Sequence, residues 1–254
     1  KTVQAEDEIA GICTAIGAAF AGNFAVTTTS GPGLSLKSEA LGLAVMAELP
    51  LVVVDVQRGG PSTGLPTKTE QSDLMQALYG RNGECPVVVL AASTPGDCFR
   101  FAFEAGKIAM EHMTPVILLT DGFIANGSQP WRIPQMSDYP AICPPVVEPH
   151  PEGEAFMPYA RDARHVRGWA FPGKAGLEHR IGGLEKHCLK GCISYEPANH
   201  QEMVRTRAAK VAAVADDLPR QEVMGAAEGD LLVIGWGGTR GNVLVTVSRF
   251  IASH

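Results

Sequence analysis

The run Leu51-Val52-Val53-Val54-Asp55-Val56 decides the fold. A continuous β-branched stretch without polar alternation is typical of a strand that is covered on both faces, as in the parallel sheets of α/β proteins. The run passes directly into a loop, Gln57 to Lys68, that is rich in Gly, Pro, Ser and Thr. Thr67 and Glu70 have the spacing of a capping box, which predicts a helix from about Thr69 to Tyr79. We therefore expect a buried strand, a loop and a helix in succession.

The same alternation continues in both directions along the chain. Apolar spacing and start signals predict helices at residues 5–21, 35–49 and 95–112, and strands at residues 24–29, 86–91 and 115–120. Thr94, with Pro95 behind it, has the pattern of a helix start. Ser30-Gly31-Pro32-Gly33 is interpreted as a turn that neither a strand nor a helix can contain. Alternation at this spacing predicts right-handed βαβ units, hence an α/β fold with a mostly parallel sheet and helices on both faces.

The regular alternation stops around Asp121. Residues 1–126 form the first predicted domain, and residues 127–200 form an irregular arm or linker that is too long for an ordinary connection. Either this arm lies over a partner or part of it is disordered. A helix at residues 201–215 and a strand at residues 230–235 predict the start of a second α/β unit, at residues 201–254. That unit is too short to bury its own faces, so we expect it to be truncated or completed by contacts elsewhere.

Composition and charge exclude several classes of function. The 254 residues carry a formal net charge of −6 and 45% of them are hydrophobic, so there is no basic field for nucleic acid or an anionic membrane. Four basic residues gather late in the chain, in what we expect to be a solvated loop: Arg161, Arg164, Arg167 and Lys174. No apolar run approaches the roughly 20 residues of a membrane span, and the first residues are too acidic for a signal peptide. A cytoplasmic location is the default expectation.

The six cysteines are scattered through ordinary sequence. Reduced thiols are therefore expected rather than a disulfide framework. Cys188 and Cys192, with His187 beside them, are spaced somewhat like metal ligands. Without a second Cys pair this spacing is a weak signal, and we expect no metal site in the chain.

Ligands of open parallel sheets bind outside the carboxyl ends of the strands. Residues 27–35, 55–69 and 121–126 fall at that edge. In the first segment, glycines whose backbone N–H groups can face a ligand closely precede a helix N-terminus. Each hydroxyl there is more simply interpreted as a turn or cap residue. The segment as a whole is nevertheless expected to be a ligand site.

Arg58 is the sharpest single candidate, because it follows directly from the buried strand. A guanidinium there can bind a planar carboxylate through two parallel hydrogen bonds. An ion pair with Asp55 or Glu70 explains the residue equally well. The acids at residues 6–8 open a helix, where the helix dipole favours any negative charge, so a structural role is the default for all three.

Three stretches together resemble a known family. They are Gln4-Ala5-Glu6-Asp7-Glu8, Thr29-Ser30-Gly31-Pro32-Gly33 and, above all, Val54-Asp55-Val56-Gln57-Arg58-Gly59-Gly60-Pro61-Ser62-Thr63-Gly64-Leu65-Pro66-Thr67-Lys68-Thr69-Glu70-Gln71-Ser72-Asp73-Leu74. They are similar to the alpha subunit of 2-oxoacid:ferredoxin oxidoreductases, most closely that of 2-oxoglutarate:ferredoxin oxidoreductase (2-oxoglutarate synthase). The resemblance implies a thiamine-diphosphate-binding domain of the pyrimidine type. For residues 201–254 it implies the start of a transketolase C-terminal-like domain.

The resemblance also implies roles for single residues. Glu6 matches the glutamate that hydrogen-bonds the aminopyrimidine ring of the cofactor, where a carboxylic acid favours the tautomer that takes the proton from the thiazolium carbon. Arg58 matches the arginine that binds the 2-oxoacid carboxylate, and Thr63 is expected to bind substrate with it. The turn formed by Thr29, Ser30, Gly31 and Pro32 is expected to line the cofactor pocket.

The implied activity is the oxidative decarboxylation of 2-oxoglutarate with coenzyme A to succinyl-CoA, with ferredoxin as the electron acceptor. The Gly-Asp-Gly motif that holds the diphosphate and Mg²⁺ in this family is absent here and belongs to the beta subunit. The cysteines lack the spacing for iron–sulfur clusters, which are also expected on partner subunits. We therefore expect an active site between two chains, in a hetero-oligomer of dimerised alpha–beta units that can include gamma and delta subunits.

The chain departs from the family pattern at both ends. Members begin with a further strand and a Tyr-Pro-Ile-Thr-Pro turn, which nothing before Lys1 matches, and the C-terminal unit is short. We expect a chain that is incomplete at both ends and active only with its partner subunit.

Several alternatives stay open. The same enzyme class can act on pyruvate or branched-chain 2-oxoacids, and a subunit can keep the fold in a non-catalytic structural or regulatory role. A nucleotide-binding module at Gly235–Gly241 has weak support from its glycine pattern. A dicarboxylate substrate requires a second cation, for which Lys37, Lys68 and Arg81 are candidates.

Overall fold

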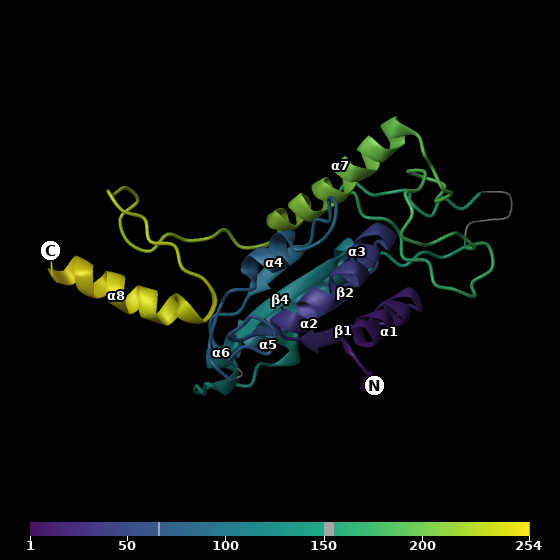
Figure 1. The fold of residues 1–254 in the computed structure, drawn as a ribbon. Helices are drawn as coiled ribbons and strands as arrows, with labels where there is room; N and C mark the ends of the chain where they lie inside the picture. Colours follow the sequence, from purple (N-terminus) through teal and green to yellow (C-terminus); the bar gives the residue numbers. More distant parts are fainter. Residues whose placement is uncertain (66, 150–154, 254) are drawn as a thin grey trace.

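The computed structural model describes residues 1–65, 67–149 and 155–253. Its centre is a parallel sheet of four strands in the order β1-β2-β4-β3. Figure 1 shows β2 between β1 and β4. The strands are β1 (Val26–Thr29), β2 (Leu51–Gln57), β3 (Val88–Ala91) and β4 (Pro115–Asp121). The predicted parallel α/β sheet is confirmed, and each predicted strand within residues 1–126 is present.

Helices connect these strands and continue beyond them. They are α1 (Glu8–Phe20), α2 (Gly31–Leu36), α3 (Ser38–Ala47), α4 (Leu74–Tyr79), α5 (Pro95–His112), α6 (Gly122–Asn126), α7 (Pro197–Ala213) and α8 (Arg240–Ser253), with short 3₁₀ turns η1 (Met136–Asp138), η2 (Val214–Asp217) and η3 (Gly237–Thr239). Asp7 caps α1 by accepting a hydrogen bond from the N–H of Ala10 at 2.7 Å. Thr94 caps α5 by accepting one from the N–H of Asp97 at 3.1 Å, which confirms the predicted helix start.

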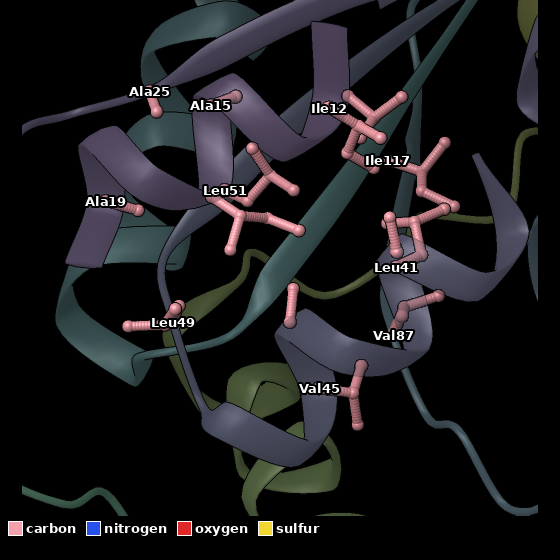
Figure 2. Close-up of a cluster of buried hydrophobic side chains, with 14 of the residues drawn as sticks. Ile12, Ala15, Ala19, Ala25, Leu41, Val45, Leu49, Leu51, Val87 and Ile117 are labelled. Atoms are coloured by element: carbon pink, nitrogen blue, oxygen red, sulfur yellow. The ribbon is translucent and has the colours of Figure 1, made fainter. Parts of the chain in front are cut away.

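Two hydrophobic clusters cover the two faces of the sheet. On one face, α1 and α3 pack against alternate residues of the central strands, including Leu51 and Ile117 (Figure 2). On the other face, α5 packs against Val52 and Val116. Alternate residues of a strand point to opposite faces, so the unbroken apolar run of β2 is buried on both. Helices on both faces are confirmed.

The predicted turn at Ser30–Gly33 is wrong, because α2 begins at Gly31. Ser30 has the extended backbone of an N-cap residue, and Pro32 lies in the first turn, where a missing N–H costs no intrahelical bond. The predicted single helix at residues 35–49 is likewise two helices, which meet at Lys37.

The helix predicted from Thr69 begins five residues later, at Leu74. The expected capping box does not form, because the Glu70 carboxylate accepts the N–H of Gly60 at 2.9 Å instead. The spacing of Thr67 and Glu70 fits a cap, but Glu70 instead makes a hydrogen bond within the loop after β2.

The strand predicted at residues 230–235 is wrong as well. Residues 231–236 have no regular structure, and Leu231 and Ile234 are 80% and 83% exposed. A strand needs a neighbour to pair with, and the described part of the chain offers none there. Figure 1 shows α8 (yellow) at the end of an extended segment, apart from the sheet.

The arm predicted at residues 127–200 is irregular up to residue 196, with η1 as its one helical turn among the described residues, but residues 197–200 already belong to α7. The expected solvated loop is wrong, however, because Arg167 is 1% exposed and Arg161 reaches the interior. The Arg161 Nη1 atom lies 2.6 Å from an oxygen of the fully buried Glu48, and Lys210 Nζ of α7 lies 2.6 Å from the same oxygen. We call Glu48, Arg161 and Lys210 the buried ion triad.

The triad attaches the arm and α7 to the end of α3. Burial by itself would raise the pKa of Glu48, but the ammonium of Lys210 and the guanidinium of Arg161 hold that pKa well below its ordinary range. Burial also lowers the pKa of Lys210 to about 8, against the opposing effect of Glu48. A buried charge is compatible with a stable fold only while its oppositely charged partners are present.

All six cysteines are free thiols. The Cys188 sulfur lies 4.0 Å from His187 Nδ1, and the described residues contain no group of three or more His, Cys, Asp or Glu side chains that could hold one metal ion. Among the helices of the described ranges, none has the length and apolar character to cross a bilayer.

Candidate functional site

The carboxyl ends of β1 and β2 bring two candidate segments together. Thr29 and Asp55 are in register on neighbouring parallel strands, so Ser30 and Arg58 emerge at the same edge of the sheet. The Arg58 Nε atom donates to the Ser30 hydroxyl oxygen at 3.3 Å. The sequence prediction that these two loops share one site is therefore consistent with their positions.

Arg58 is half-buried and its guanidinium is held at a second point. Its Nη1 atom donates to the backbone oxygen of Thr63 at 2.6 Å. The loop between them is closed by hydrogen bonds from the N–H of Gly59 to the Lys68 carbonyl and from the N–H of Leu65 to the Gly59 carbonyl. Thr63 thus lies beside Arg58, but its contact is made by the backbone.

The alternative ion pair of Arg58 with Asp55 or Glu70 is not formed. Within the described ranges, Arg58 has no salt bridge and its Nη2 atom has no hydrogen-bond acceptor. A half-buried guanidinium with unused N–H groups keeps its capacity to bind an anion.

At the start of α2, two glycines allow neighbouring side chains to pack against the backbone. A Cβ atom on Gly31 would lie 2.7 Å from both carboxylate oxygens of Asp73, and one on Gly33 would collide with the Thr29 hydroxyl. Only glycine fits at either position. The hydroxyl of Ser30 does not cap α2, so it is available to Arg58.

Glu6 lies just before α1, and its side chain is exposed. The start of α1 reaches the same edge of the sheet, because a Cβ atom on Gly33 would come within 2.8 Å of Glu8 Cγ. Asp7 is the N-cap of α1, which confirms a structural role for that acid. Glu6 itself has no hydrogen bond or ion pair with another described residue, so its carboxylate is uncommitted.

Two of the three cations considered for a distal carboxylate are already engaged. Lys37 is buried and donates to the Glu8 carbonyl at 2.7 Å and to the Thr27 hydroxyl at 3.3 Å. Arg81 donates to carbonyls at the end of α4, including that of Leu78 at 2.8 Å. Lys68 is exposed.

Sequence reasoning missed a buried pair of acids beneath this edge. Asp55 is fully buried and Asp73 is 8% exposed. Burial, together with the neighbouring Asp73 carboxylate, raises the pKa of Asp55 to about 8. The signal that could have revealed the pair is an acid inside the β-branched run of a strand that is covered on both faces.

Residues 1–193 match the family model described as "Pyruvate flavodoxin/ferredoxin oxidoreductase, thiamine diP-bdg". The chain belongs to this family. The resemblance inferred from the three sequence stretches is confirmed, and so is the thiamine-diphosphate-binding fold.

Relatives within the oxidoreductase family share most of the chain. This chain is 61% identical over 244 residues to the 2-oxoglutarate oxidoreductase subunit KorA of Mycobacterium tuberculosis. The aligned part covers 95% of this chain and 37% of that protein. The chain is 33% identical over 252 residues to the 2-oxoglutarate synthase subunit KorA of Methanothermobacter marburgensis, covering 96% of this chain and 64% of that one. The chain therefore spans about a third to two thirds of these relatives.

A solved structure gives the same result at the level of the fold. The 2-oxoglutarate:ferredoxin oxidoreductase from Magnetococcus marinus, with 2-oxoglutarate, coenzyme A and succinyl-CoA bound, superposes with a TM-score of 0.92 and 41% sequence identity. The match covers 100% of this chain and 44% of that one.

Proposed function

We propose that this chain is the pyrimidine-domain region of the alpha subunit of a 2-oxoglutarate:ferredoxin oxidoreductase. The enzyme oxidatively decarboxylates 2-oxoglutarate with coenzyme A to succinyl-CoA and carbon dioxide, and the electrons released reduce ferredoxin. The observation that carries the proposal is Arg58, a guanidinium fixed by Ser30 and Thr63 at the carboxyl end of β2 with N–H groups to spare. Support also comes from relatives named for 2-oxoglutarate.

In this proposal Arg58 binds the carboxylate next to the keto group of the substrate. Two parallel hydrogen bonds from a planar guanidinium fix the orientation of a carboxylate as well as its position. Ser30 and the Thr63 carbonyl hold the guanidinium in place before substrate arrives, which reduces the entropy lost on binding. Thr63 therefore contributes to substrate binding through its backbone.

The residues at this edge fit the aminopyrimidine half of thiamine diphosphate. Glu6 has an exposed, uncommitted carboxylate, and Gly31, which has no side chain of its own, begins α2 beside Ser30. When bound, the cofactor supplies the nucleophilic carbon and the electron sink for decarboxylation. Glu6 would hydrogen-bond its ring nitrogen, while Thr29, Ser30, Gly31 and Pro32 would line the pocket.

The remaining chemistry belongs to other chains in this proposal. Mg²⁺, the diphosphate site and the iron–sulfur clusters lie on partner subunits, with the beta subunit completing the active site. Gamma or delta subunits and a dimer of alpha–beta units complete the assembly, which works in the cytoplasm with ferredoxin as acceptor.

The test is steady-state kinetics of the assembled alpha–beta enzyme with an artificial one-electron acceptor. Arg58→Ala is expected to raise the KM for 2-oxoglutarate by about tenfold to a hundredfold, because a charge-assisted hydrogen bond contributes roughly 1.5–3 kcal/mol. Arg58→Lys keeps the positive charge but cannot form two parallel hydrogen bonds, so it is expected to restore the KM only in part.

Arg220→Ala is the matched control, since Arg220 is exposed and distant in sequence from the site. An unchanged KM in Arg58→Ala would remove the carboxylate role. Assays with pyruvate and a branched-chain 2-oxoacid show which 2-oxoacid the assembled enzyme prefers. Absence of turnover with all three substrates would favour a structural or regulatory subunit instead.

A further inference from the structure

The buried acids Asp55 and Asp73 lie directly beneath the proposed substrate site. Asp55 is on β2, three residues before Arg58, and no N–H or hydroxyl group among the described residues donates to its carboxyl oxygens; the group that faces it is the carboxyl of Asp73, with which it can form a hydrogen bond only when one of the two is protonated. An unpartnered ionised carboxylate in such surroundings is very costly. Its position therefore requires either a proton or a ligand.

Asp73 is held in place by a network that crosses the sheet. Its N–H donates to the Gln57 side-chain oxygen at 3.1 Å, and the Gln57 amide nitrogen donates to the carbonyl of Thr120 on β4 at 3.1 Å. Its carboxylate packs against the bare backbone of Gly31, the first residue of α2. Asp73 thus contacts the start of α2, directly after the Ser30 that bonds Arg58.

Four charged or titratable groups act on one another here. Asp55 faces Asp73 from β2, and Asp73 is also influenced by Glu70 of the same loop and by Arg58. Burial and the Glu70 carboxylate raise the pKa of Asp73, the hydrogen bond with Asp55 and the guanidinium of Arg58 lower it, and on balance the pKa is raised. Two adjacent acids in one site do not both ionise readily, and the proton belongs to the pair. Asp55 is the better place for that proton, because it is fully buried and the guanidinium of Arg58 acts on Asp73 but not on Asp55.

We propose that Asp55 and Asp73 form a positioning pair that shares one proton and keeps a single negative charge beneath Ser30, Gly31 and Arg58. The single charge orients the guanidinium without neutralising it. Loss of the shared proton adds a second negative charge, which repels an incoming substrate carboxylate. This inference rests on the proposed function, because it assigns the pair to the binding of the 2-oxoacid.

The first test is the KM for 2-oxoglutarate of the assembled enzyme as a function of pH. Burial and the Asp73 carboxylate raise the pKa of Asp55 to about 8, so the wild-type KM is expected to rise by about tenfold between pH 7.5 and roughly pH 9.5, equivalent to about 1.4 kcal/mol. Asp55→Asn cannot gain that charge, and its KM is expected to stay flat over the same range. Asp73→Asn removes the retained charge and is expected to raise the KM already at neutral pH, with a smaller effect on kcat.

Asp216→Asn, an exposed acid on η2, is the control and should reproduce the wild-type profile. Identical pH profiles for wild type and Asp55→Asn would overturn the proposal, as would an unchanged KM in Asp73→Asn. A purely structural role would alter kcat, KM and stability together without changing the pH profile.

The second test is independent of activity. Below the ordinary pKa of 3.8 Asp55 is protonated in both states, and between that value and about 8 only the folded chain keeps the proton. The stability that this proton contributes is therefore lost as pH rises through that window. The equilibrium constant for unfolding increases by up to tenfold for each pH unit. Denaturant unfolding of Asp55→Asn should lack this component, and an equal pH dependence would overturn the shared proton. If the wild-type enzyme turns over no 2-oxoacid but its stability still shows this pH dependence, the proposed function is wrong while the shared proton of Asp55 and Asp73 is supported.

Discussion

Glu6 and Arg58 differ in how strongly the fold constrains them. Two hydrogen bonds fix the guanidinium of Arg58, whereas Glu6 is an exposed carboxylate ahead of α1. A side chain that has no partner among the described residues is free to bind a ligand. Substitution of Glu6 is therefore expected to change catalysis without changing the stability of the fold.

Glu6→Gln is expected to leave the fold intact and to lower the turnover of the assembled enzyme by a hundredfold or more, in the range typical of a lost general acid–base group. Gln can still donate a hydrogen bond but cannot exchange a proton. The measurement is kcat together with thiamine diphosphate affinity by calorimetry. Glu39→Gln, an exposed acid in the first turn of α3, is the control. Equal turnover in both variants would contradict the catalytic assignment.

At the residue level, the sequence predicted some positions and not others. The positions of Arg58 and Ser30 at the sheet edge are predictable because a polar segment after an apolar strand lies at that edge, although the segment after Ser30 is a helix and not the predicted turn. The role of Asp73 is not predictable, because its contact with Gly31 joins residues 42 positions apart and depends on the bend of the loop after β2. Long-range packing of this kind has no local periodicity.

At the level of elements, one of the two predicted caps forms and the other does not. Thr94 caps α5 as its pattern indicates, because the side chain and the N–H it accepts are three residues apart. The start of α4 was misplaced because Glu70 has a partner across the loop, at Gly60. The strand at residues 230–235 was misassigned because strand pairing depends on a neighbour and not on the segment itself.

Thr94→Ala is expected to destabilise the chain by about 1 kcal/mol, since it leaves the N–H of Asp97 without its side-chain acceptor. Thr94→Ser keeps the oxygen and should retain most of the stability. Chemical denaturation of the three proteins measures the difference. Equal destabilisation by Ala and Ser would show that the lost methyl group matters and the cap does not.

At the level of the whole molecule, the buried ion triad attaches the irregular arm and α7 to the sheet domain. Glu48→Gln leaves Arg161 and Lys210 inside without their anion, which is expected to cost about 3–5 kcal/mol. Protease cleavage within residues 155–196 should accelerate in parallel, because the arm loses its anchor.

Glu148→Gln provides a matched control, since it breaks the ion pair between Glu148 and Lys174. The side chain of Glu148 is 72% exposed. Exposed pairs contribute little, so neither stability nor cleavage should change appreciably. Similar behaviour of the two variants would mean that the arm is attached mainly by apolar contacts such as those of Trp169.

The separation of the triad members along the chain also has a consequence during synthesis. Glu48 and Lys210 are 162 residues apart, and a ribosome adding roughly 5–20 residues per second needs on the order of 10–30 s to make the chain between them. The guanidinium of Arg161 is made earlier, 113 residues after Glu48. Until Arg161 and then Lys210 have been added, the sheet can assemble but the carboxylate of Glu48 lacks its buried partners and must remain in contact with water. The end of α3 therefore stays open after the sheet has formed, and it is a place where a chaperone could bind the nascent domain.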